Sequence, residues 1–126
     1  MQANNAPYSL VDNNMMIPEA GRNPSPGPNP LATDLPIEFI SKKFNQNLPY
    51  GLLKANTSSD AGKYVCEYTY FTSLSLYEQM NLMKSSLFVH VPRKTTDDDI
   101  KNIAKSLVRL IKICVEHLNY KTGLLV

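Results

Sequence analysis

The clearest pattern in the chain is an apolar stripe of helical spacing in its last third. The stripe follows three consecutive aspartates, at positions 97–99, which suit the positive end of a helix. Apolar residues then recur at intervals of three and four positions. They are Ile100, Ile103, Ala104, Leu107, Val108, Ile111, Cys114, Val115 and Leu118. This pattern predicts a helix over about 97–119.

Two shorter helices are predicted upstream. The first begins at Pro36, a residue favoured in a first helical turn, and is expected over about 36–46. The second is expected from about Gly62 into the late seventies, on the spacing of Tyr64, Val65, Tyr68, Phe71 and Leu74. Several of these side chains are aromatic or β-branched, so a strand is the competing prediction for this second segment.

Two segments have the pattern of strands. Residues 52–56 fit a short strand, and residues 86–92 form an apolar run that is interrupted by His90 and closed by Pro92. Such a run is typical of a strand buried on both faces of a parallel sheet. The order strand, helix, strand, helix implies parallel strands joined by right-handed crossovers. The predicted fold class is therefore α/β, a parallel sheet flanked by helices.

The start of the chain has a different composition. Residues 1–34 contain six prolines and six asparagines, which cannot sustain a helix or a central strand. We therefore expect a Pro/Asn-rich loop segment over 1–34, followed by a single partial α/β domain over 35–126.

Composition limits the classes of function. The 126 residues are 43% hydrophobic and carry a formal charge of +2, which is too small to indicate nucleic acid or an anionic membrane as the partner. The two cysteines show neither a disulfide framework nor a metal-ligand spacing. The first twenty residues lack a secretory signal, and no apolar run approaches the roughly 18 residues of a membrane span. The sequence predicts a soluble, cytoplasmic protein without metal, cofactor, nucleic acid or membrane partner.

Cys66 and His90 are the residues with the strongest potential for chemistry. Cys66 falls in the opening turn of a predicted helix, where amide dipoles stabilise a thiolate. His90 falls at the end of the neighbouring predicted strand, and the carboxyl ends of parallel strands share one edge of a sheet. One hypothesis is therefore a Cys/His pair for nucleophilic catalysis. The alternative is a buried cysteine and a hydrogen-bonded core histidine, and the Cys114 thiol within the apolar stripe is interpreted as core.

Two ordered motifs around these residues resemble a known family. Residues 59–70, SDAGKYVCEYTY, and residues 87–92, LFVHVP, resemble the D-A-G-x-Y-x-C and F-[IV]-H-[IV]-P motifs of pyroglutamyl peptidase I. Leu35-Pro36-Ile37 is similar to a helix start of that family, and Ile17-Pro18 loosely resembles the loop before it. The resemblance implies a cytosolic cysteine peptidase of α/β fold that removes N-terminal pyroglutamate from peptides.

The resemblance also implies roles for four residues. Cys66 would be the nucleophile and His90 its base, while Tyr64 and Val65 correspond to positions that help form the pocket for the lactam ring. Amides of the turn at Cys66 would hold the oxyanion.

The chain departs from the family pattern at one catalytic position. The resemblance covers the carboxyl-terminal part of the family's domain, whose sheet we expect to be truncated at its N-terminal side. No residue matches the triad glutamate, since the first glutamate, Glu19, already lies beyond Ile17-Pro18. Loss of the acid from a related triad costs roughly four orders of magnitude in turnover. Two hypotheses follow, a weakly active peptidase or a catalytically inactive binding module, and the uncovered sheet edge predicts self-association.

Overall fold

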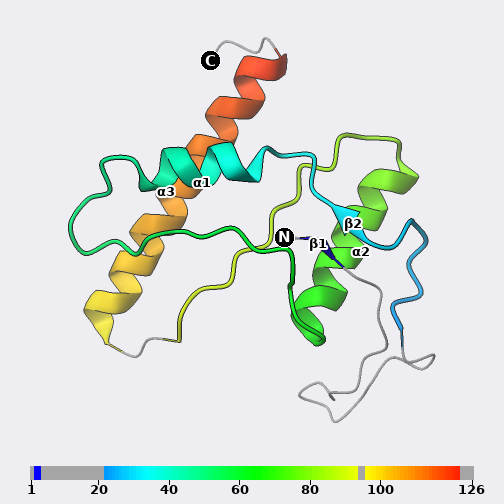
Figure 1. Cartoon of the computed structure of the whole chain (residues 1–126), viewed down its shortest axis with the longest axis horizontal. Coiled ribbons are helices and arrows are strands. Elements are labelled where there is room, and N and C mark those ends of the chain that lie inside the picture. The colour runs from blue at the N-terminus through cyan, green and yellow to red at the C-terminus, as the bar shows by residue number, and fades with distance from the viewer. Residues whose placement is uncertain (1, 4–21, 94–95, 123–126) are drawn as a thin grey trace. The chain divides into compact units, whose positions relative to one another are not determined.

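The chain folds into two compact units, each built from two separate stretches of sequence. The computed structural model describes residues 2–3, 22–93 and 96–122, so the Ile17-Pro18 motif lies outside the described residues. The first unit comprises Met1–Leu35 with Ser58–Val89, and the second comprises Pro36–Thr57 with His90–Val126. In chain order the elements are β1 (Gln2–Ala3), β2 (Leu31–Ala32), α1 (Ile37–Asn45), α2 (Val65–Gln79) and α3 (Asp97–Thr122) (Figure 1).

The first unit is centred on α2. Its short strands β1 and β2 pair in antiparallel fashion, with Gln2 opposite Ala32, and both contact the helix. The buried cluster of this unit consists of Leu31, Ala61, Tyr70, Phe71 and Leu74, with Phe88 packed against it. The rings of Tyr70 and Phe88 lie 5.8 Å apart between centroids, which is within the range of favourable aromatic pairs. This pairing attaches the segment after α2 to the helix itself.

A proline-rich segment is attached to α2 by side-chain hydrogen bonds. The buried Asn23 amide donates to the backbone carbonyl of Tyr68 and to the Thr72 hydroxyl, each at 2.8 Å. The buried Ser75 hydroxyl donates to the carbonyl of Pro26. Because prolines lack the amide hydrogen that a strand ladder or helix interior requires, polar side chains supply the hydrogen bonds that hold the segment.

The second unit consists of α1 lying across α3 (Figure 1). Ile40 and Phe44 of α1 and Ile113 of α3 are buried. Arg109 of α3 donates from Nε to the carbonyl of Phe44 at 3.0 Å and from Nη2 to the carbonyl of Gln46 at 2.7 Å. The last carbonyls of a helix have no partner within it, so this guanidinium satisfies the end of α1.

The structure confirms the three predicted helices but changes two of the predicted faces. The buried residues of α2 are Glu67, Tyr70, Phe71, Leu74 and Ser75, so the helix is rotated away from the face through Tyr64 and Tyr68 that the spacing predicted. On α3, the apolar stripe is largely exposed, because this helix meets α1 through the side that carries Arg109 and Ile113.

Neither segment predicted as a strand forms one. Within the described residues the only strand pairing is that of β1 with β2, so the predicted parallel sheet is not shown and the architecture is mainly helical with little strand. In the segment 52–56, the backbone amide of Ala55 donates to Asn45 Oδ1 at 2.8 Å, and its carbonyl accepts from Asn45 Nδ2 at 2.7 Å. The side chain of Asn45 thus occupies the groups that a strand neighbour would use.

Residues 86–92 differ from the predicted buried strand in exposure as well. Val89 and Val91 are 40% and 50% exposed, and His90 is exposed. A strand exists only through pairing with another strand, and the described residues offer no such partner to this segment. None of the helices in the described ranges combines the length and the apolar character needed to cross a membrane.

Candidate functional site

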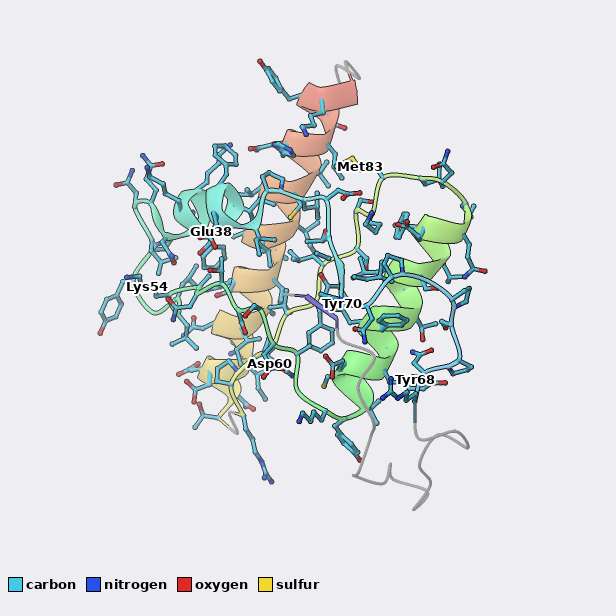
Figure 2. The ribbon with its side chains drawn as sticks, turned by 45° about the vertical axis from the view of Figure 1, so that its right-hand side comes forward. Glu38, Lys54, Asp60, Tyr68, Tyr70 and Met83 are labelled. Atoms are coloured by element: carbon cyan, nitrogen blue, oxygen red, sulfur yellow. The ribbon has the colours of Figure 1, made fainter. Side chains whose placement is uncertain are left out.

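A tight turn leads into α2. The Gly62 amide donates to Asp60 Oδ1 at 2.8 Å, and the Asp60 amide donates to the Ser58 hydroxyl at 3.1 Å. Asp60 is labelled in this turn in Figure 2. Gly62 has φ of +94°, a conformation that favours glycine, and a Cβ built on it would meet no described atom within 4 Å. The turn therefore exposes backbone on this side, where a ligand can approach closely.

Cys66 is the second residue of α2 and is half-buried. Tyr64 is at the N-cap with extended backbone, and its side chain makes no capping hydrogen bond. The amides of a first helical turn have no acceptor within the helix, and their dipoles favour negative charge. The prediction that Cys66 lies in an opening helical turn is confirmed.

Tyr64 and Val65, the two residues predicted for the pocket, precede Cys66 at the same helix start. Tyr64 is half-buried and Val65 is 45% exposed. Both side chains are thus at least partly exposed to solvent.

His90 lies in the irregular segment between α2 and α3. It is exposed and is the first residue of the second stretch of the second unit, whereas Cys66 belongs to the first unit. The pairing of Cys66 with His90 stays a prediction.

Sequence reasoning missed a buried acidic residue beside Cys66. Glu67 is 1% exposed, in the first turn of α2, where a carboxylate interacts favourably with the helix dipole. A signal for its burial is present in the sequence, because Glu67 stands three, four and seven positions before Tyr70, Phe71 and Leu74. It shares the helix face that forms the core of the first unit.

The second thiol lies in a different setting. Cys114 of α3 is half-buried, so the prediction of a core cysteine is only partly met. Burial raises the pKa of its thiol, which reduces the thiolate fraction at neutral pH. Of the two free cysteines, Cys66 is therefore the better candidate for nucleophilic chemistry.

Comparisons with known proteins agree with the motifs. The sequence profile described as pyroglutamyl peptidase matches residues 2–117. The pyrrolidone-carboxylate peptidase of Oceanobacillus iheyensis is 31% identical over 109 residues, which cover 83% of this chain and 53% of that protein. Pyroglutamyl-peptidase 1 of Homo sapiens is 27% identical over 120 residues, which cover 94% of this chain and 54% of that protein. No solved structure matches. The chain spans about half the length of these relatives.

Proposed function

This chain belongs to the pyroglutamyl peptidase family, and we propose that it carries the nucleophile of a cysteine peptidase that removes N-terminal pyroglutamate from peptides. The observation that carries the proposal is the position of Cys66. The thiol lies in the DAGKYVC motif, at the start of α2, next to a turn whose backbone is open at Gly62.

The reaction begins with attack of Cys66 Sγ on the carbonyl carbon that joins pyroglutamate to the next residue. His90 accepts the thiol proton as the C–S bond forms, and the negative charge moves to the carbonyl oxygen. Amides of the first turn of α2 are placed to stabilise this oxyanion. When the C–N bond breaks, His90 gives its proton to the leaving amine. Water then attacks the thioester with His90 as base, which releases pyroglutamate and restores the thiol.

The remaining parts of the site follow from the same proposal. Tyr64 and Val65 border the lactam ring, since both are accessible beside Cys66. Residues 86–92 become a strand of a parallel sheet flanked by helices once a neighbouring strand pairs with them, and the carboxyl end of that strand brings His90 to the edge where α2 begins. Two free thiols suit a reducing, cytoplasmic location.

The test is the release of a fluorophore from a pyroglutamyl amide by the full chain. Cys66→Ala and Cys66→Ser should abolish release, while Cys114→Ala, which removes the other thiol, should retain the rate within about twofold. The assay uses high protein concentration and long incubation, so that slow turnover is detected. Equal rates for the parent chain and both Cys66 variants would refute the catalytic role.

A catalytically inactive binding module is the second candidate. In that case the chain would bind a peptide with N-terminal pyroglutamate, and would discriminate against the same peptide beginning with glutamate, without any turnover. Val65→Asp should weaken this binding, because it places a charge beside the apolar lactam ring. Binding measured by isothermal titration with no fluorophore release would select this candidate.

A further inference from the structure

The second unit contains an open groove that the peptidase motifs do not explain. It lies between the end of α1, the loop at 49–52 and one side of α3, and has a volume of about 510 Å³. The residues that line it are Lys43, Pro49, Tyr50, Leu52, Asn102, Lys105, Val108, Arg109, Lys112, Ile113 and Glu116.

The charges around the groove are mostly positive. Four cationic side chains line it against the single carboxylate of Glu116. Lys43 is 3.1 Å from that carboxylate, and Arg109 is engaged by the carbonyls at the end of α1. Lys105 and Lys112 are exposed on α3, and neither takes part in an ion pair within the described part of the chain. These two lysines leave the groove with a surplus of positive charge.

The groove also presents apolar surface between these charges. Ile113 is 7% exposed and lies at the α1–α3 contact, while Val108 remains 52% exposed and Leu52 is half-buried. An exposed aliphatic side chain flanked by two lysines suits a ligand that has both an apolar side chain and carboxylates.

One wall of the groove is formed by a close approach of backbone to α3. Gly51 has φ of +87°, and a Cβ built on it would lie 3.3 Å from Asn102 Nδ2. The loop at 49–52 can approach the helix this closely because glycine has no side chain. Arg109 holds the other wall through Phe44 and Gln46, so the groove is formed before any ligand arrives, which lowers the cost of binding.

We propose that this groove docks an acidic peptide segment through one apolar anchor side chain. Its carboxylates pair with Lys105 and Lys112, and its anchor packs on Val108. The open form of the groove suits an extended chain better than an enclosed small molecule. A second copy of this chain is the poorer occupant, because a symmetric contact would bring the same lysines against each other.

The proposal can be tested with three synthetic twelve-residue peptides, each carrying a fluorophore. One is rich in glutamate with a central leucine, one replaces the glutamates with lysines, and one replaces the leucine with serine. Fluorescence anisotropy with the full chain should show binding of the first peptide, weakened by added salt, and at least about tenfold weaker binding of the other two.

Matched variants locate the binding on the chain. Lys105→Glu with Lys112→Glu should weaken binding of the acidic peptide about tenfold or more, whereas Lys101→Glu with Lys121→Glu should have little effect. Both pairs lie on exposed positions of α3 and change the net charge equally. Val108→Ser should likewise weaken binding, and Ile100→Ser, at a position of similar exposure on the same helix, should not.

Three results would overturn the proposal. Equal loss of binding in the two double variants would indicate general attraction to a basic protein. Equal binding of the acidic and basic peptides would remove the role of charge. Concentration-dependent dimerisation that disappears in Val108→Ser, without peptide binding, would assign the groove to a second copy instead. Circular dichroism of each variant verifies that its helices are intact.

Discussion

Asp34 and Lys84 are joined by two hydrogen bonds across fifty positions of sequence. The Lys84 amide donates to Asp34 Oδ2 at 2.7 Å, and the Asp34 amide donates to the Lys84 carbonyl at 2.8 Å. The Lys84 ammonium also lies 3.1 Å from Glu78 and 3.4 Å from Asp34. Hydrogen bonding to Glu78, and then the charge of Asp34, raise the pKa of Lys84. This pair attaches the segment after α2 to the chain that follows β2.

Loss of the Asp34 carboxylate should destabilise the first unit. We expect Asp34→Ala to lower the free energy of unfolding by about 1–2 kcal/mol, because the Lys84 amide loses its acceptor. Asp34→Asn keeps an acceptor oxygen, so it should lower the free energy of unfolding by less than Asp34→Ala does. Glu78→Gln removes only an exposed ion pair and should cost at most about 0.5 kcal/mol. Urea unfolding followed by circular dichroism measures the series, and an equal effect of Asp34→Ala and Glu78→Gln would contradict this role of the carboxylate.

Substitution of a buried residue of α2 should lower the free energy of unfolding far more than substitution of an exposed residue on the same helix. Phe71 is 0% exposed, so Phe71→Ala should lower the free energy of unfolding by about 3–5 kcal/mol through lost burial and the cavity left behind. Leu76 on the same helix is 55% exposed, and Leu76→Ala should change stability by about 0.5 kcal/mol or less. The same urea titration compares the two variants. A small effect at Phe71 would mean that this ring is not in the core.

Tyr70 should make stability depend on alkaline pH. Burial raises the pKa of Tyr70 to about 12, and a hydrogen bond with the Thr33 backbone opposes the shift only partly. The pKa of tyrosine in an unfolded chain is about 10. The stability that the neutral, buried Tyr70 phenol contributes is therefore complete below about pH 10 and is lost as pH rises toward about 12. Figure 2 labels this residue on α2.

The comparison that isolates this effect uses Tyr70→Phe, since lysines titrate in the same range. Between about pH 10 and 12 the parent chain should lose stability more steeply than Tyr70→Phe. Tyr50→Phe, at a fully exposed position, should keep the slope of the parent chain. Parallel slopes for all three proteins would show that the Tyr70 phenol is not protected from solvent.

The two thiols should differ in reactivity. Iodoacetamide at pH 7.5 should modify Cys66 before Cys114, because burial raises the pKa of the Cys114 thiol and so lowers its thiolate fraction. Peptide mass mapping over a time course measures both rates in one sample, and urea-unfolded protein supplies the reference in which the two rates converge. Faster modification of Cys114 in the folded chain would contradict this order.

Helices could be predicted from the sequence because their hydrogen bonds are local. The spacing of apolar residues predicted α1, α2 and α3, and it placed the start of α2 near Cys66. The buried face of α2 was predicted only in part: the spacing included Phe71 and Leu74, but it included Tyr68 rather than the buried Tyr70, which packs in the cluster with Leu31 and Phe88. Burial of Glu67 was missed as well.

Strands could not be predicted equally well because a strand depends on its neighbour. Residues 86–92 have the composition of a buried strand, yet composition does not supply a pairing partner. In the segment 52–56 a single side chain, Asn45, binds the backbone of Ala55. The pairing of Cys66 with His90 was inferred from a sheet edge, so it stays a prediction together with the sheet.

The alternation of the two units along the chain limits how the protein can be dissected. The backbone passes from one unit to the other after Leu35, after Thr57 and after Val89. A truncation at residue 90 would remove α3. Helix α1 would then lack Arg109, whose guanidinium binds the carbonyls at its carboxyl end. Neither half can therefore be isolated by trimming one terminus. A recombinant version of either would need two non-adjacent stretches spliced through a new linker.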